Sequence, residues 1–168
     1  GTPLDMAKIL TSLTLSAMLV GYVFGILFIP RYISQAKALM LSALVALACV
    51  VVILLSDPAS TASVWIFDLS AFHGRVVELP VTVIFVALLG LGNALMWPAI
   101  WPLAMDGIGS ALKTGSAMLI MAILGGALAM PVWTAMSPDK SIGSSQNAYW
   151  LLLPFYLFIG WYSVSGWR

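Results

Sequence analysis

Long apolar runs separated by shorter polar connectors make up most of this 168-residue chain. An apolar stretch of about 18 residues or more can cross a bilayer core roughly 30 Å thick as a helix. Five stretches reach that length, at about 6–29, 37–56, 81–105, 115–136 and 148–165. Pro30 follows the first and Pro80 precedes the third, and proline is common at such helix ends. The pattern predicts an all-α, polytopic membrane helical bundle with five transmembrane helices, forming a single domain over residues 1–168.

The composition agrees with lipid as the solvent, because 62% of the residues are apolar and only 8% are charged. An ordinary soluble domain has about 25% charged residues. Seven basic and six acidic side chains could not solvate the surface of so small a globule. The net charge of +1, without a basic stripe, excludes nucleic acid as a partner. The single cysteine, Cys49, excludes an internal disulfide and a multi-cysteine metal site, and we interpret it as a packing residue.

Five spans place the two termini on opposite sides of the membrane, and the basic residues divide between these sides. One side carries four of them: Arg31, Lys37, Lys113 and Arg168. The other side carries three: Lys8, Arg75 and Lys140. Because the four lie in short connectors or at the chain end, the positive-inside rule places their side in the cytoplasm and the N-terminus outside. The chain begins at Gly1 without a basic segment or a cleavage motif, so we expect no signal peptide and a fragment or processed chain.

The longest connector, 57–80, contains apolar residues among polar ones, at 64–67 and 71–72. This composition suits a short element that lies on the membrane surface or packs over a helix end. The connector also holds His73, which we interpret as a loop residue, because one imidazole without nearby thiols or paired carboxylates is a weak metal or catalytic signal. Among the groups that enzymes use, the spans offer only a cysteine. We therefore expect no enzyme activity, no catalytic residue, no metal site and no cofactor.

Asn93 is the polar exception within the predicted spans, since it is their only side-chain amide and stands near the centre of the third. At a rise of 1.5 Å per residue it lies within roughly 3 Å of the bilayer midplane, where no water can satisfy it. Trp97 and Trp101 follow at four-residue steps on the same helix face, with Gly90 one turn earlier. Amide and indoles together suit a neutral sugar, with its hydroxyls on the amide and its C–H face on an indole. The alternative is that Asn93 bonds a neighbouring helix while the tryptophans pack.

Three prolines predict bends within the spans. Pro98 and Pro102 each remove a backbone hydrogen-bond donor, so the third span should be kinked or locally opened. Pro131 could bend the fourth span in the same way. A kink that lines a cavity and a purely structural kink both fit this pattern.

Small residues and tyrosines inside the spans predict how helices meet. Small residues at four-residue spacing are typical of close helix contact. Two such pairs occur, Gly21 with Gly25 and Ala122 with Gly126, the second beside Gly125. Tyrosine hydroxyls inside a span can bond a ligand or, as we prefer, a neighbouring helix, and two tyrosines are placed for this: Tyr22 and Tyr156.

Three segments resemble a known family: 21–35 (GYVFGILFIPRYISQ), 92–104 (GNALMWPAIWPLA) and 113–127 (KTGSAMLIMAILGGA). They are similar to the C-terminal half of bacterial fucose and glucose/galactose symporters of the major facilitator superfamily. The resemblance covers nearly the whole chain and equates its spans with helices eight to twelve of a twelve-helix transporter. It implies two six-helix bundles that carry a glucose-, galactose- or fucose-class monosaccharide between them by alternating access, in the bacterial inner membrane. The candidate substrate-binding residues are Asn93, Trp97, Trp101 and Tyr22.

The resemblance also shows what this chain lacks. The resemblance implies that the N-terminal bundle and the equivalent of helix seven lie outside this sequence, and that the family's coupling carboxylates lie in that other half. The resemblance implies a coupling proton, or Na+, that this piece does not bind by itself. We expect the piece alone not to transport, and to work with a longer parent chain or another subunit. The alternative from a different class is a non-transporting five-helix membrane scaffold or assembly subunit.

Overall fold

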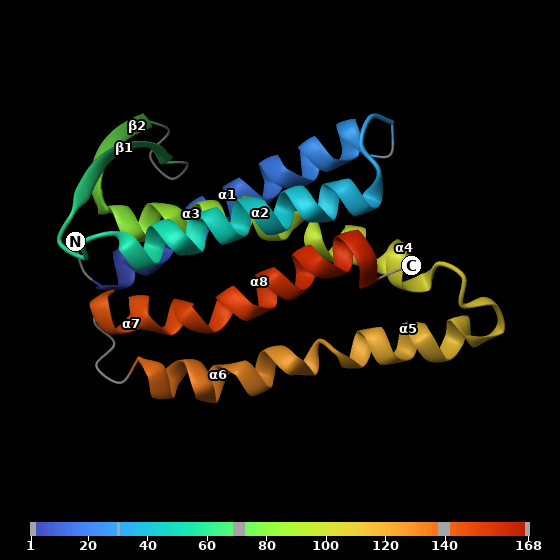
Figure 1. Cartoon of the computed structure of the whole chain (residues 1–168). Coiled ribbons are helices and arrows are strands. Elements are labelled where there is room, and N and C mark those ends of the chain that lie inside the picture. The colour runs from blue at the N-terminus through green and yellow to red at the C-terminus, as the bar shows by residue number, and fades with distance from the viewer. Residues whose placement is uncertain (1–2, 30, 69–72, 138–141, 167–168) are drawn as a thin grey trace.

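The computed structural model describes residues 3–29, 31–68, 73–137 and 142–166, and it is mostly helical, with one β-hairpin (Figure 1). The elements are α1 (Pro3–Phe28), α2 (Gln35–Leu55), β1 (Thr61–Asp68), β2 (His73–Pro80), α3 (Val81–Ala94), α4 (Met96–Met105), η1 (Gly109–Ala111), α5 (Leu112–Met121), α6 (Leu124–Met136), α7 (Ile142–Ala148), η2 (Tyr149–Leu151), α8 (Leu152–Trp161) and the π-helical η3 (Tyr162–Gly166).

Within the described ranges, five helical stretches are long and apolar enough to cross a membrane: Lys8–Phe28, Gln35–Leu55, Val81–Met105, Gly109–Met136 and Ser145–Gly166. The predicted all-α polytopic bundle with five spans is therefore confirmed. The third, fourth and fifth stretches each combine more than one helical element. The start of α1 and the end of η3 lie at opposite ends of the bundle, as an odd number of spans requires (Figure 1).

The first three spans meet through glycines. A Cβ added to Gly21 of α1 would lie 2.7 Å from Ala94 Cβ, and one added to Gly90 of α3 would lie 2.8 Å from the backbone oxygen of Thr14. On another face of α3, a Cβ at Gly92 would lie 3.0 Å from the backbone nitrogen of Ala46. Because these glycines carry no side chain, α3 packs closely against both α1 and α2. The Gly21 and Gly25 pair thus packs helices, as its spacing predicted.

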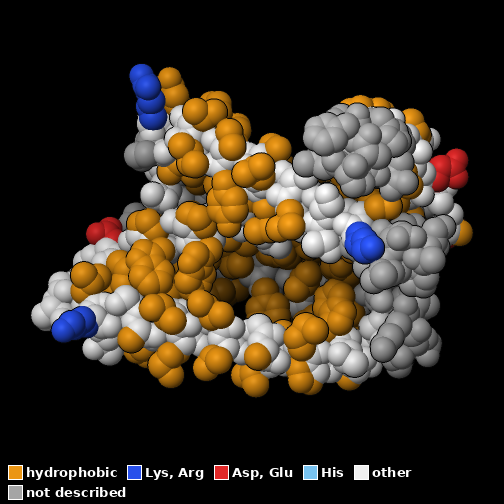
Figure 2. Space-filling model, turned by 180° about the vertical axis from the view of Figure 1, so that it is seen from behind, with side chains coloured by type: hydrophobic (Ala, Val, Ile, Leu, Met, Phe, Trp, Pro, Cys, Tyr) orange, Lys and Arg blue, Asp and Glu red, His pale blue; other side chains and the backbone are white. Residues whose placement is uncertain are grey.

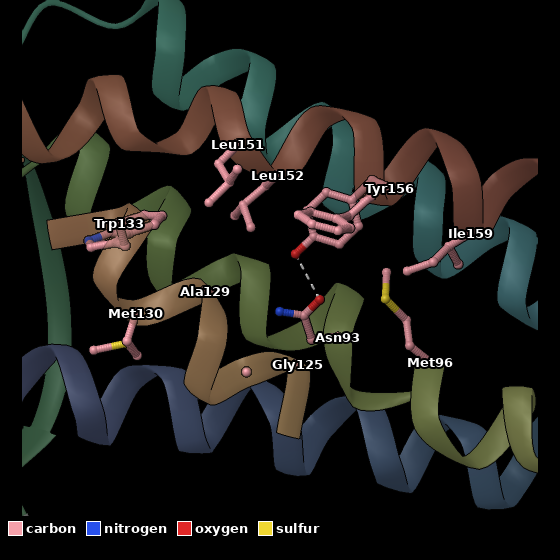
Figure 3. Close-up of a pocket in the computed structure, with 12 residues that line it drawn as sticks. Asn93, Met96, Gly125, Ala129, Met130, Trp133, Leu151, Leu152, Tyr156 and Ile159 are labelled. Atoms are coloured by element: carbon pink, nitrogen blue, oxygen red, sulfur yellow. Dashed lines mark hydrogen bonds between the residues drawn. The ribbon is translucent and has the colours of Figure 1, made fainter. Parts of the chain in front are cut away.

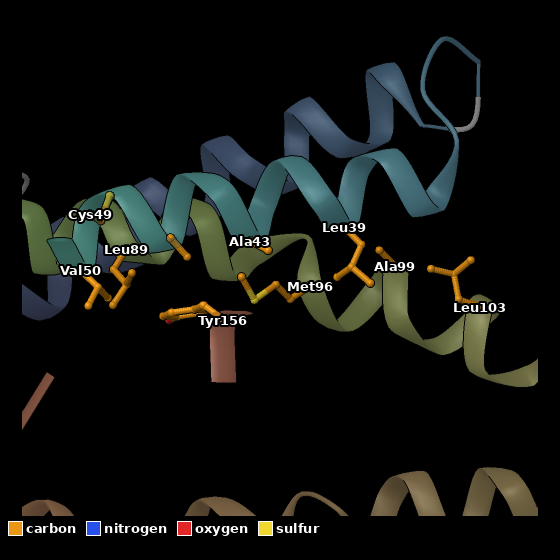
Figure 4. Close-up of a cluster of buried hydrophobic side chains, with 10 residues drawn as sticks. Leu39, Ala43, Cys49, Val50, Leu89, Met96, Ala99, Leu103 and Tyr156 are labelled. Atoms are coloured by element: carbon orange, nitrogen blue, oxygen red, sulfur yellow. The ribbon is translucent and has the colours of Figure 1, made fainter. Parts of the chain in front are cut away.

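A buried hydrophobic cluster joins α2, α3, α4 and α8 (Figure 4). Its members are Leu39, Ala43, Ala46, Cys49, Val50, Leu89, Met96, Ala99, Leu103 and Tyr156. Half of them come from α2, which therefore lies at the centre of the bundle. Cys49 is buried in this cluster, which confirms its interpretation as a packing residue.

The third span is interrupted at Leu95, between α3 and α4. Pro98 has no backbone N–H to give to the carbonyl of Ala94, and the helix resumes where the Ala99 N–H donates to the Leu95 oxygen at 3.0 Å. The predicted opening of this span is confirmed. Pro102 lies inside α4 without ending it.

The fourth span contrasts with the others, because neither α5 nor α6 contains a buried residue. It is interrupted at 122–123, where the Gly125 N–H donates to the Ala122 oxygen at 2.9 Å. Pro131 lies inside α6, away from this interruption. A Cβ at Gly125 or Gly126 would meet nothing within 4 Å. The helix packing predicted for Ala122 and Gly126 is therefore wrong for the described residues, since the space in front of the glycines is empty.

The long connector, predicted to hold a short element on the membrane surface or over a helix end, forms an antiparallel β-hairpin, β1 with β2. Trp65 pairs with Val76 and Val64 with Val77, so β-branched and aromatic residues stand opposite one another, which favours strands. The Val81 N–H donates to the Ser60 oxygen at 3.0 Å and closes the hairpin at its base. His73 begins β2, so its assignment to a loop was wrong, while 71–72 lie outside the described residues.

We predict that Gly90→Val destabilises the bundle, because its first added carbon would collide with the backbone oxygen of Thr14. Overpacking of this kind costs about 1–3 kcal/mol. Thermal unfolding of the purified chain in lipid nanodiscs measures the change. Gly160→Val in α8 is the matched control, because a Cβ at Gly160 would meet nothing within 4 Å. Equal stability of the two variants would contradict the close contact between α1 and α3.

Candidate binding cavity

The packing of α3 decides where Asn93 points. Successive helix residues turn by about 100°, and Gly92 is already turned to α2 while Ala94 is turned to α1. Asn93 is left on the remaining side, which faces α8. There its Oδ1 accepts a hydrogen bond of 2.9 Å from the hydroxyl of Tyr156 (Figure 3). The alternative interpretation of Asn93 was a hydrogen bond to a neighbouring helix. The Oδ1 atom makes such a bond, to Tyr156 of α8.

The position of α8 depends on a second amide, Gln146 of α7. Its Nε2 donates to the backbone oxygen of Ile53 and, at 2.7 Å, to that of Ser56. These oxygens belong to the C-terminal end of α2, where carbonyls have no partner within the helix. Gln146 is buried, so the two bonds hold the start of the fifth span against α2. Tyr156 then enters the buried cluster with only 6% of its surface exposed.

Beyond this pair lies a cavity of about 360 Å³ between α3, α6 and α8. Seen from behind, the surface is hollowed above the α5–α6 segment, with hydrophobic side chains around the hollow (Figure 2). The lining residues are Asn93, Met96, Gly125, Gly126, Ala129, Met130, Trp133, Leu151, Leu152, Phe155, Tyr156 and Ile159. None of them is Asp, Glu, His, Lys or Arg, so the described lining is nearly apolar and carries no charge.

The Asn93 amide gives this cavity its polar end. Its Oδ1 is occupied by Tyr156, and its Nδ2 lies on the opposite side of the amide (Figure 3). Among the residues that the structure describes, none accepts a hydrogen bond from Nδ2. Two N–H donors are therefore free to bind an acceptor in the cavity, and a sugar hydroxyl is such an acceptor.

The α6 wall is attached to the rest of the bundle near its C-terminal end. The Trp133 and Tyr149 rings meet edge to face, with centroids 4.8 Å apart and planes at 81°. The hydroxyls of Ser137 and Ser145 lie 2.9 Å apart and share a hydrogen bond. Aromatic pairs of this geometry stabilise a contact beyond the area they bury. The cavity wall is thus fixed at one end, while the Gly125 end has no contact of this kind.

The structure separates Asn93 from the other predicted site residues. Trp97 and Trp101 contact each other, with ring centroids 5.9 Å apart, but neither lines the cavity. In α4 the residue that lines the cavity is Met96, three positions after Asn93. Tyr22 lies on α1, 40% exposed and outside the lining.

Of the residues that line the cavity, the sequence singled out Asn93 and Tyr156 as polar groups, but it did not predict that α6 forms a wall. The preferred interpretation of Tyr156, a hydrogen bond to a neighbouring helix, is confirmed. Trp133, Ala129 and Met130 were missed, because no polar residue marks their face of α6. The described residues also include no group of three or more His, Cys, Asp or Glu that could hold a metal ion.

Together, the fold and the cavity define a multi-pass membrane protein of the helical-bundle class, with an uncharged cavity among its spans. The comparison with known proteins points to transport. The chain is 29% identical over 136 residues to a glucose/galactose transporter of Brucella abortus biovar 1 (strain 9-941) and, equally, to one of Brucella abortus (strain 2308). The match covers 81% of this chain and 27% of each relative, so the chain spans about a quarter of their length. No family profile matches the chain, and no solved structure does.

We predict that Tyr156→Phe lowers the stability of the bundle by about 1 kcal/mol, the usual net contribution of one hydrogen bond. A double-mutant cycle with Asn93→Leu, measured by thermal unfolding in nanodiscs, isolates the bond, because the cycle subtracts the effect that each substitution has by itself. Tyr162→Phe serves as the control, since Tyr162 packs against the same cluster. A coupling energy of zero would show that the hydroxyl and the amide do not interact.

Proposed function

We propose that this chain is the C-terminal bundle of a secondary active transporter of the major facilitator superfamily, which carries a neutral monosaccharide of the glucose, galactose or fucose class. The observation that supports it most is the half-occupied Asn93 amide, whose Oδ1 is bound by Tyr156 and whose Nδ2 has no acceptor among the described residues. It faces an uncharged cavity in a chain that is similar to glucose/galactose transporters.

The cavity suits a neutral polyhydroxylated ligand. Free amide donors bind hydroxyl oxygens, and the apolar side chains around them cover the C–H faces of a sugar ring. A charged ligand would enter a lining without any charged partner, which is costly in a membrane. Trp97 and Tyr22 are 43% and 40% exposed, so they are accessible to a sugar held between two bundles. Together with Trp101 they remain proposed contacts.

The second bundle follows from the incomplete packing of the first. The α5–α6 segment has no buried residue, and the chain spans 27% of the length of its relatives. We propose that residues 1–168 are one membrane domain and that a missing N-terminal bundle covers the open side. Rocking of the two bundles then exposes the sugar to each side of the membrane in turn. The described lining holds no carboxylate, and we assign the coupling proton or Na+ to the other bundle as part of the same proposal.

The second candidate function is a non-transporting five-helix scaffold or assembly subunit. The unburied α5–α6 segment favours it, because such a surface suits a permanent partner as well as a moving bundle. The two functions differ in one property. A scaffold has no reason to bind sugar at Asn93, whereas a transporter must.

We predict that the wild-type chain in lipid nanodiscs binds one hexose of a monosaccharide panel, and that Asn93→Ala weakens the affinity about tenfold through loss of its donors. Calorimetric or fluorescence titration measures both. Asn147→Ala, the chain's other asparagine, lies outside the cavity lining and should bind as the wild type does. Counterflow uptake into proteoliposomes bearing the complete transporter extends the same comparison to transport. Absence of hexose binding to a well-folded wild type favours the scaffold.

The orientation is also part of the proposal, with α1 beginning outside the cell and the 106–111 connector in the cytoplasm. We predict that Ala59→Cys reacts with a membrane-impermeant thiol reagent on intact cells, whereas Ser110→Cys reacts only after permeabilisation. Both positions are exposed and lie at opposite ends of the bundle. Cys49 is buried and gives little background. The reverse labelling pattern would show the opposite orientation.

A further inference from the structure

Gly125 and Gly126 of α6 differ from the glycines that pack helices. A Cβ at Gly21, Gly90 or Gly92 would lie within 3.0 Å of a neighbouring helix, but a Cβ at Gly125 or Gly126 would meet nothing within 4 Å. Neither of the two is needed for close helix contact in this structure. Nor does either have a left-handed backbone conformation, which would require glycine for another reason.

The helix periodicity places both glycines on the cavity side of α6. The lining residues contributed by this helix are Gly125, Gly126, Ala129, Met130 and Trp133. Their spacing is that of a single face of an α-helix, on which residues recur every three or four positions. A side chain added at either glycine would therefore extend toward the cavity.

Side-chain size along this wall increases from one end of the cavity to the other. Gly125 lies at the Asn93 end and Trp133 at the far end, beyond Ala129 and Met130 (Figure 3). The space in front of the free Nδ2 donors of Asn93 is therefore bounded by bare backbone. A side chain at either glycine would reduce the space available to a ligand bonded to that amide.

We propose that Gly125 and Gly126 determine the size of the sugar that the site accepts, leaving room beside Asn93 for a hexose with its exocyclic hydroxymethyl group. This inference rests on the proposed function, because it assigns a role to residues of the same cavity. One added methyl group at either glycine shifts the preference toward a pentose. Xylose is the suitable probe, because it has the ring hydroxyls of glucose and lacks only the hydroxymethyl group.

The test compares glucose and xylose binding to the chain in nanodiscs, for the wild type, Gly125→Ala and Gly126→Ala. We expect each alanine variant to lower the ratio of glucose to xylose affinity roughly tenfold, the usual effect of one methylene in a pocket. Gly160→Ala makes the same change in α8, outside the lining and with open space around it, and should keep the wild-type ratio. Asn93→Ala should weaken both sugars equally.

The possible outcomes separate this inference from the proposed function. A wild type that binds neither sugar overturns the proposed function and this inference with it. Sugar binding that depends on Asn93 but shows an unchanged ratio in both glycine variants overturns the inference alone. A lower unfolding temperature for Gly126→Ala than for Gly160→Ala would assign the glycines to helix packing and also overturn it.

A second measurement needs no sugar. Gly126→Cys should react with a water-soluble thiol reagent in nanodiscs at least tenfold faster than Leu128→Cys. Leu128 is on the same helix, 75% exposed but outside the cavity lining, so lipid surrounds it. Equal rates would show that position 126 faces lipid, which contradicts the proposed role.

Discussion

The close approach of α1 and α2 to α3 is the constraint on which the rest of the structure depends. Lipid is as apolar as the side chains, so helices in a membrane gain little from hydrophobic burial and associate through tight van der Waals contact. Gly90 and Gly92 allow that contact on two sides of α3. The side that remains is the only one on which Asn93 can point, and it faces α8. The position of the polar end of the cavity thus follows from the glycines at positions 90 and 92, which let α1 and α2 cover the other sides of α3.

The hydrogen bond between Tyr156 and Asn93 uses only the acceptor side of the amide. An amide near the middle of a membrane is costly when unpaired. The Tyr156 hydroxyl satisfies its acceptor side and, because Tyr156 belongs to the buried cluster, fixes its orientation. The donor side then enters the cavity in a defined direction. A preoriented donor loses little entropy on binding, which is how the proposed site would distinguish hydroxyl arrangements with few polar groups.

The sequence predicted the features that depend on the solvent or on a single helix. It did not predict the features that depend on which helices lie next to one another. The lengths of the apolar runs predicted the spans, because a helix must be long and apolar enough to cross the bilayer. Pro98 predicted the interruption of the third span. The four-residue step from Asn93 to Trp97 did not predict the cavity lining, which holds Met96 and not Trp97. Gly21 with Gly25 and Ala122 with Gly126 have the same spacing, yet only the first pair meets another helix. The two strands of the hairpin were not predicted, because their apolar residues lie in a connector between much longer apolar runs.

The hairpin has a consequence for work on the protein. Its base is closed by the bond from Val81 to Ser60, and α3 starts at the residue after β2. The path from α2 to α3 is thus set at the base, independently of how far the strands extend. A rigid soluble domain spliced between β1 and β2 would therefore be held in a defined direction relative to the bundle. The chain has a mass of 17.9 kDa, and most of it consists of candidate membrane spans. Such a fusion would add the mass and the visible landmark that single-particle electron microscopy needs.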